Sequence, residues 1–204
     1  MIKNYSFDLG KVLVRLNHEK LARLYIDDEK AIKQVIEVVF DRLYWDKLDL
    51  GTITDDEVKT DFCRRLPKEL HEGACAVYDN CIYHQKPIEE MKKLLKDIKR
   101  QGGKLYLLSN ISCYFAENYH KNPVLADLFC IFDGLVFSGP LGIAKPDIRI
   151  FEHLLNTYNL KAEESIFIDD LPQNVVGAQN AGINGYVFDG DADRLREYLK
   201  INNY

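Results

Sequence analysis

The feature that most constrains the fold is a short apolar run near the N-terminus that ends in an acid. Tyr5–Phe7 lead to Asp8, Gly10 follows, and a second apolar run begins at Val12. A run of this kind is typical of a buried strand, which would place Asp8 at the end of the strand where open α/β sheets bind ligands. A carboxylate there can attack an electrophile or hold a cation. A single strand-end Asp more often only caps a turn, so its role depends on the rest of the chain.

Beyond residue 86 the chain alternates apolar runs with amphipathic segments. We expect buried strands at 105–108, 135–137, 166–168 and 186–188, with helices between them. This alternation implies a parallel sheet with helices on both faces, so the predicted fold class is α/β with a doubly wound, Rossmann-like core. In such a sheet the carboxyl ends of the strands share one edge.

The segment that follows the first strand has helical patterns and no convincing strand. Apolar side chains recur at helical spacing in one stripe over residues 32–43. Thr54 and Glu57 predict a capping box that begins another helix. Pro87 is expected at the first position of a later helix, where a missing N–H costs nothing.

These patterns predict the domain organisation. We expect an all-helical cap over residues 16–85, inserted after the first strand of a core formed by residues 1–15 and 86–204. With 204 residues, of which 47% are hydrophobic, the chain can bury one core and a small accessory unit.

Composition limits the partners that we expect. The formal net charge of −5 argues against a nucleic-acid-binding or membrane-binding surface. Five cysteines without a C-x-x-C pair predict mostly buried, reduced thiols. We see no signal peptide and no apolar stretch long enough to cross a bilayer, so we expect a cytoplasmic protein. The sequence leaves the oligomeric state open.

Polar clusters follow three of the expected strands. Asp8 follows the first, Ser109 and Asn110 end the second, and Asp169 and Asp170 follow the strand at 166–168. Carboxylates brought together at one sheet edge repel each other unless a cation lies between them. Oxygen ligands with room for water and phosphate suit Mg²⁺.

Lys145 completes this set, because it precedes the helix expected from Pro146 onwards. Its ammonium can balance the charge of Asp8 and of an incoming phosphate. The Ser109 hydroxyl and the free N–H groups of the following turn suit phosphate oxygens. A nucleophile, a metal site, hydrogen-bond donors and a lysine together describe phosphoryl transfer to an aspartate.

These residues carry a resemblance to a known family. The chain resembles the haloacid dehalogenase-like (HAD) hydrolase superfamily, and within it the helical-cap phosphatases similar to bacterial α-glucose-1-phosphate phosphatase. The segment 48–54 also resembles one that is common in the caps of this family. Four motifs stand in the family's order over nearly the whole chain: Phe7-Asp8-Leu9-Gly10, Leu107-Leu108-Ser109-Asn110, Lys145-Pro146-Asp147 and Ile168-Asp169-Asp170 with Asn174 following.

The resemblance implies a role for each position. Asp8 would become an aspartyl phosphate, Ser109 and the Asn110 backbone would hold the phosphoryl group, and Lys145 would orient and neutralise it. The implied Mg²⁺ ligands are Asp8, the backbone carbonyl of Gly10, Asp169 and Asp170, with Asp170 preferred over Asp169 as the direct ligand.

One position departs from the family pattern. Most phosphatases of this family have a second Asp two places after the nucleophile as general acid and base, whereas this chain has Gly10. The metal site needs only the backbone carbonyl there, but proton transfer loses its usual donor. His18 and Glu19 of the cap are candidate substitutes, although surface roles are more common for such residues.

We therefore expect a Mg²⁺-dependent phosphatase of small phosphorylated metabolites, with a sugar phosphate among the candidate substrates. The alternatives are a haloacid dehalogenase, in which Asp8 attacks carbon without a metal, and a non-catalytic phosphate-ligand-binding protein. The cap is expected to determine the substrate and to exclude water when it closes. Tyr44 and Trp45 are candidates for the pocket wall, although the core of the cap is the commoner place for such residues.

Overall fold

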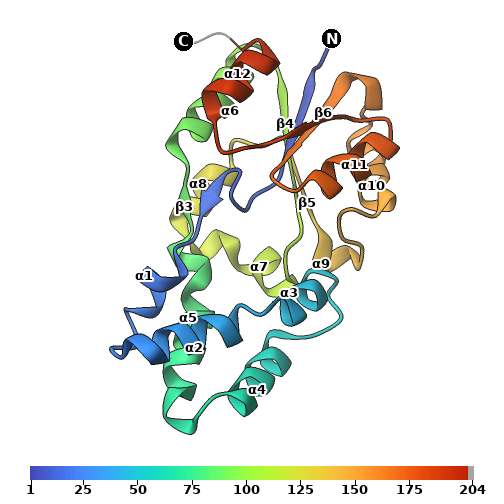
Figure 1. Cartoon of the computed structure of the whole chain (residues 1–204). Coiled ribbons are helices and arrows are strands. Elements are labelled where there is room, and N and C mark those ends of the chain that lie inside the picture. The colour runs from blue at the N-terminus through green and yellow to red at the C-terminus, as the bar shows by residue number, and fades with distance from the viewer. Residues whose placement is uncertain (202–204) are drawn as a thin grey trace.

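The computed structural model describes residues 1–201, and its centre is a five-stranded parallel sheet in the order β5-β4-β1-β6-β7 (Figure 1). The expected α/β class and every expected strand are confirmed. The strands are β1 (Asn4–Phe7), β4 (Lys104–Ser109), β5 (Gly134–Phe137), β6 (Ser165–Asp169) and β7 (Asn184–Val187).

Helices cover both faces of this sheet because alternate side chains of the central strands point to opposite sides. Leu105 and Leu107 belong to one apolar cluster, with α6 (Glu89–Arg100), α8 (Pro123–Phe129) and α12 (Ala192–Leu199). Tyr106 and Leu108 belong to another, with α10 (Ile148–Tyr158) and α11 (Pro172–Asn180). The core is therefore doubly wound.

Strand register brings the polar clusters together. Phe7 of β1 lies opposite Leu107 of β4 on one side and Ile168 of β6 on the other. The residues that follow these three positions therefore meet at one edge of the sheet. In Figure 1 this edge faces the helices that lie between residues 18 and 80, while the N-terminus and α12 lie at the opposite end of the core.

The helices that lie between residues 18 and 80 form a second hydrophobic cluster of their own. The two chain segments that lead into and out of this unit are joined by a short antiparallel ribbon, β2 (Val14–Arg15) with β3 (Lys86–Pro87). We propose residues 16–85 as the cap and keep the name for this unit. Its helices are α1 (His18–Ala22), α2 (Glu29–Val39), α3 (Arg42–Asp49), α4 (Asp55–Arg65) and α5 (His71–Asn80), with the 3₁₀ turns η1 (Lys68–Leu70) and η2 (Cys81–His84).

Of two predictions for helices in the cap, one is confirmed and the other is wrong. Thr54 and Glu57 form the predicted capping box at the start of α4. The apolar stripe expected over residues 32–43 is interrupted, because α2 ends at Val39 and Asp41 caps a separate helix, α3. Leu43, the last member of the stripe, is 67% exposed.

Two further expectations need correction. Pro87 does not begin a helix, because it pairs with Val14 in the ribbon, and α6 begins at Glu89. The cysteines are free thiols as expected but not mostly buried, since four are half-buried and Cys130 is exposed. The remaining elements are α7 (Cys113–Asn118), α9 (Ser138–Leu141), η3 (Tyr119–Lys121) and η4 (Ala162–Glu164).

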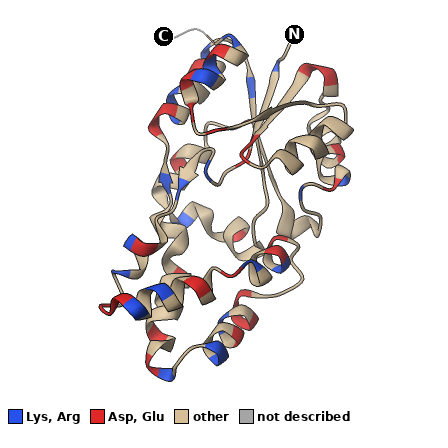
Figure 2. Ribbon diagram, in the orientation of Figure 1, with Lys and Arg blue, Asp and Glu red and all other residues tan. Residues whose placement is uncertain are grey.

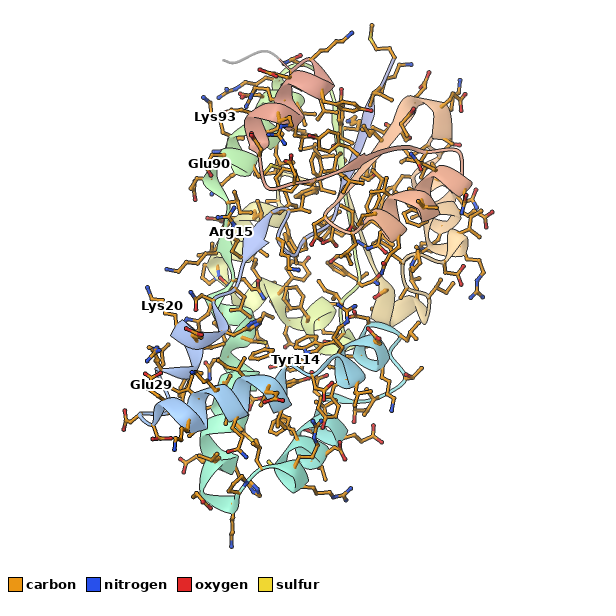
Figure 3. All side chains as sticks on the ribbon, viewed as in Figure 1. Arg15, Lys20, Glu29, Glu90, Lys93 and Tyr114 are labelled. Carbon is orange, nitrogen blue, oxygen red and sulfur yellow. The ribbon has the colours of Figure 1, made fainter. Side chains whose placement is uncertain are left out.

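The surface carries charges of both signs. Lys and Arg are interspersed with Asp and Glu along the helices of the core and the cap (Figure 2). Labelled charged residues of both units, such as Lys20 and Lys93, point outward in Figure 3. Within residues 1–201, each helix is too short or too polar to cross a bilayer.

Candidate active site

The first strand delivers Asp8 to the sheet edge. The Asp8 backbone N–H donates to the Ile168 carbonyl at 2.9 Å, which fixes the chain one residue beyond the end of β1. The chain then reverses in a tight loop, in which Lys11 adopts a left-handed backbone conformation with φ 60°. This loop is closed by a hydrogen bond from the Lys11 N–H to the Val14 carbonyl. Gly10 is thereby held beside Asp8.

Lys145 links two of the predicted acids. Its Nζ donates to Asp8 Oδ1 and to Asp169 Oδ2, both at 2.7 Å, and to the Leu108 carbonyl at 2.9 Å. The side chain is 1% exposed. Burial alone would lower the pKa of Lys145, but the two carboxylates raise it above its ordinary value. The lysine is therefore a fixed buried cation.

Ser109 and Asn110 reach the site in different ways. The Ser109 hydroxyl donates to Asp8 Oδ1 at 3.2 Å, so it lies beside the expected nucleophile. The Asn110 side chain instead binds the backbone of Lys145, with Nδ2 donating to its carbonyl at 3.0 Å and Oδ1 accepting from its N–H at 2.8 Å. This second role, which fixes the lysine, was absent from the sequence prediction.

The acid pair divides into two environments. Asp169 is fully buried, and its oxygens accept hydrogen bonds from Lys145, from the Leu171 N–H at 2.8 Å and from Asn174 Nδ2 at 3.0 and 3.1 Å. Asp170 is half-buried, and the exposed Lys11 ammonium lies 3.5 Å from its Oδ2. Asp169 is thus already committed to protein donors, while Asp170 is available to a ligand.

The acids also fit a cation. Asp8, Asp169 and Asp170 each offer an oxygen, and these atoms lie within 4.8 Å of one another. Burial and the neighbouring Asp169 raise the pKa of Asp8, which Lys145 only partly offsets. A hard divalent cation with oxygen ligands, such as Mg²⁺, would relieve this repulsion.

A cavity of about 790 Å³ extends from these residues to the cap. Much of its wall beyond the acids is apolar or aromatic. Trp45 lies in this wall, whereas Tyr44 does not: it is buried in the cap, where its hydroxyl donates to Asp61. Tyr114, labelled in Figure 3, lies between the core and the cap helices. The other large apolar members of the wall are Leu9, Val14, Leu16, Phe40, Leu50, Tyr78, Ile82, Ile111, Phe115 and Leu171.

The two suggested proton donors differ. His18 lies in the cavity wall with its ring 4.0 Å from that of Phe40, and burial lowers its pKa. Glu19 is exposed and lies outside the wall. A further acid of the wall, Asp49 at the end of α3, was not predicted. The signal was present, since an acid at a helix C-terminus is electrostatically disfavoured unless it has a partner or a purpose.

The chain is similar to a known hydrolase family and to two phosphatases. The family model for haloacid dehalogenase-like hydrolase matches residues 2–182. The chain is 28% identical to the sesquiterpene phosphatase astK of Aspergillus oryzae, over 88% of this chain and 86% of that protein. It is 24% identical to a glyceraldehyde 3-phosphate phosphatase of Methanothermobacter thermautotrophicus, over 99% of this chain and 92% of that protein.

A solved structure shares the fold. The HAD family enzyme of Bacteroides thetaiotaomicron, in complex with magnesium and inorganic phosphate, matches with a TM-score of 0.66 at 22% identity. The match covers 96% of this chain and 99% of that one. Together with the family match over most of the sequence, the doubly wound core and its acidic edge lead to one conclusion: the chain belongs to the haloacid dehalogenase-like hydrolase family.

Proposed function

We propose that this protein is a Mg²⁺-dependent phosphatase of small phosphorylated molecules that works through an aspartyl phosphate on Asp8. One observation carries the proposal: a buried lysine holds Asp8 Oδ1 at 2.7 Å while two further acids stand within metal-binding distance. This set suits a carboxylate nucleophile that must approach an anionic phosphoryl group.

Each residue then has a task. Lys145 and Ser109 both donate to Oδ1 of Asp8 and so fix the carboxylate for attack on phosphorus. In our proposal Ser109 and the Asn110 backbone hold the phosphoryl oxygens, while the Asn110 side chain keeps Lys145 in place. The fixed donors supply electrostatic stabilisation without reorganisation during the reaction.

Mg²⁺ would be held by Asp8, Asp170 and the backbone carbonyl of Gly10. It would supply charge neutralisation between the nucleophile and the phosphate oxygens. Asp169 would act mainly by holding Lys145, because its oxygens already accept hydrogen bonds from three residues. Asp170 has only a weak contact with an exposed lysine, and this supports its assignment as the direct ligand.

The cavity wall bears on the organic part of the substrate. His18, Phe40, Trp45 and Tyr78 form a chain of ring contacts with centroid separations of 4.0 to 6.5 Å. Such a wall favours an apolar or flat group over a polyhydroxylated one, because burying hydroxyls without partners is costly. The likeness to a sesquiterpene phosphatase supports the same direction. A sugar phosphate as substrate remains a prediction, as does the likeness to α-glucose-1-phosphate phosphatase. The panel of esters described next tests both.

The test is a panel of phosphate monoesters assayed with Mg²⁺. It includes farnesyl phosphate, phenyl phosphate, glyceraldehyde 3-phosphate and glucose 1-phosphate. Release of inorganic phosphate from at least one ester is expected, with kcat/KM higher for the apolar esters. Higher values for the sugar esters would overturn the substrate preference but not the reaction.

The two alternative functions predict different assay results. A haloacid dehalogenase would release chloride from 2-chloropropionate without Mg²⁺, and a binding protein would bind esters without releasing phosphate. We favour the phosphatase because a dehalogenase, which attacks carbon, has no need for the further acid Asp170 beside its nucleophile.

A further inference from the structure

The proposed chemistry lacks a proton donor next to the nucleophile. Apart from the adjacent residues Leu9 and Lys11, a Cβ built on Gly10 would have one heavy atom of residues 1–201 within 4 Å, Asp8 Oδ2 at 3.9 Å. This side of Asp8 is therefore open space. An alkoxide leaving group with a high pKa needs a proton as its bond to phosphorus breaks, so the donor must come from elsewhere in the cavity.

Asp49 occupies a suitable position in the cavity wall. It is the last residue of α3, and the turn that follows packs against the core. A Cβ on Gly51 would lie 2.5 Å from the Gly139 carbonyl oxygen and 3.3 Å from Cys113 Sγ. This close approach packs the turn after α3 against the core. It thereby holds Asp49 in the wall of the cavity that also contains Asp8.

Asp49 differs from the other cap-side acids of the wall in having no partner. Its carboxylate makes no hydrogen bond or ion pair with any residue in the described range 1–201. The others are engaged: Asp46 with Arg42 at 3.7 Å, Asp55 with the Tyr78 hydroxyl at 2.6 Å and Asp79 with Lys59 at 3.0 Å.

Its surroundings favour the protonated carboxyl. The pKa of Asp49 is raised to about 7, mainly by burial and further by repulsion from Asp46 and Asp8, while Lys145 and Arg42 oppose the rise. The helix C-terminus, where backbone carbonyls concentrate negative charge, acts in the same direction. An acid that is part protonated near neutral pH can both give and take a proton.

We propose that Asp49 is the general acid and base of this site, supplied by the cap in place of the acid that Gly10 lacks. The assignment rests on the proposed phosphatase function. It makes closure of the cap a requirement for chemistry as well as for exclusion of water.

The two half-reactions balance. In the first, an Asp8 oxygen forms a bond to phosphorus, the bond to the leaving oxygen breaks, and that oxygen takes the proton of the Asp49 carboxyl. In the second, water forms a bond to phosphorus, its proton passes to the Asp49 carboxylate, and the electron pair of the broken bond returns to Asp8. An alcohol and inorganic phosphate leave, and both acids are restored.

The experiment compares wild type with Asp49→Asn on two esters: p-nitrophenyl phosphate, whose leaving group needs no proton, and phenethyl phosphate, whose alkoxide does. The parameter kcat/KM reports only the steps up to release of the alcohol. We expect a fall of about 10²- to 10⁴-fold for the alkyl ester and less than about tenfold for the nitrophenyl ester. Equal falls for both esters would indicate a binding role, and no fall for either would also overturn the proposal.

A second readout examines the other half-reaction. With p-nitrophenyl phosphate, Asp49→Asn should release one equivalent of nitrophenolate in a burst and then turn over slowly, because water attacks without a base. Steady turnover at the wild-type rate without a burst would contradict the role of Asp49 as base.

Controls separate the possible failures. Asp56→Asn changes an acid on the next cap helix whose side chain is 94% exposed, and it should leave both esters unaffected. Adding Gly10→Asp to Asp49→Asn should restore part of the alkyl-ester activity, since position 10 has room for a side chain beside Asp8. If wild type hydrolyses neither ester nor any other of the panel, the proposed function itself has failed. If wild type is active and Asp49→Asn is equally active, only the role proposed for Asp49 has failed.

Discussion

Asn110 and Lys145 are joined by two hydrogen bonds, each between the asparagine side chain and the lysine backbone. They lie 35 residues apart, one after β4 and the other before α10. This pair anchors the backbone from which the lysine side chain reaches Asp8 and Asp169. The position of the site's buried cation therefore depends on an amide whose side-chain hydrogen bonds go to the lysine backbone.

Asn110→Ala is expected to lower both activity and stability. Loss of the two hydrogen bonds leaves the Lys145 backbone groups without these partners, at a cost on the order of 2 kcal/mol in unfolding free energy. We expect kcat to fall at least tenfold as the ammonium shifts. Asn184→Ala, which removes a side-chain bond to the Ser165 carbonyl at the other end of the sheet, should leave kcat unchanged. Urea titration and steady-state kinetics measure the two effects.

Asp8→Asn should remove turnover while the fold persists. The amide oxygen can still accept from Lys145 and Ser109, but a neutral amide is no nucleophile toward phosphorus. We expect a loss of at least about 10³-fold in kcat, read as phosphate release, with an unchanged circular dichroism spectrum. Retention of more than a tenth of wild-type activity would remove Asp8 from its assigned role.

Asp169→Asn and Asp170→Asn should have opposite signatures. Asp169 is a buried partner of a buried lysine, so its loss should cost about 3 to 5 kcal/mol of unfolding free energy. Asp170 is half-buried and weakly paired, so its loss should change stability by less than about 1 kcal/mol. Chemical denaturation in EDTA measures both variants, and similar losses would contradict this division of roles.

Magnesium should stabilise the wild-type fold. A cation that binds only the folded chain adds about 2.7 kcal/mol at 100 times its Kd, so the Tm should rise on addition of Mg²⁺ and activity should be lost in EDTA. Asp170→Asn should abolish this rise. Asp127→Asn, an exposed acid on α8, should keep it. A rise of equal size in Asp170→Asn would show that the ion binds elsewhere.

Asp49 should make stability depend on pH. Its folded pKa of about 7 lies above its ordinary value of 3.8, so between these two values the folded chain holds a proton that the unfolded chain has released. The contribution of Asp49 to the free energy of unfolding is therefore greatest below pH 4, and it is lost as the pH rises toward 7. Relative to Asp49→Asn, wild type should lose more than about 1 kcal/mol between pH 4 and pH 8. Urea titrations of both proteins in EDTA test this, and a difference independent of pH would contradict it.

The sequence by itself determined the fold class, the strands and the shared edge. These depend on local patterns: apolar runs of strand length, capping residues such as Thr54, and an acid or amide directly after each run. Period-two alternation places each strand's side chains, so the residue that follows the strand is fixed once the register is set. The four motifs therefore predicted which residues meet.

Only the tertiary structure decided how these residues share their work. The two acids after β6 are neighbours in sequence, yet one is buried among donors and the other is half-buried beside Lys11. Asp49 became a candidate only because the turn at Gly51 packs on Gly139, 88 residues further along the chain. Burial, partner geometry and the pKa that follows from them arise from contacts distant in sequence, and local patterns carry no record of these.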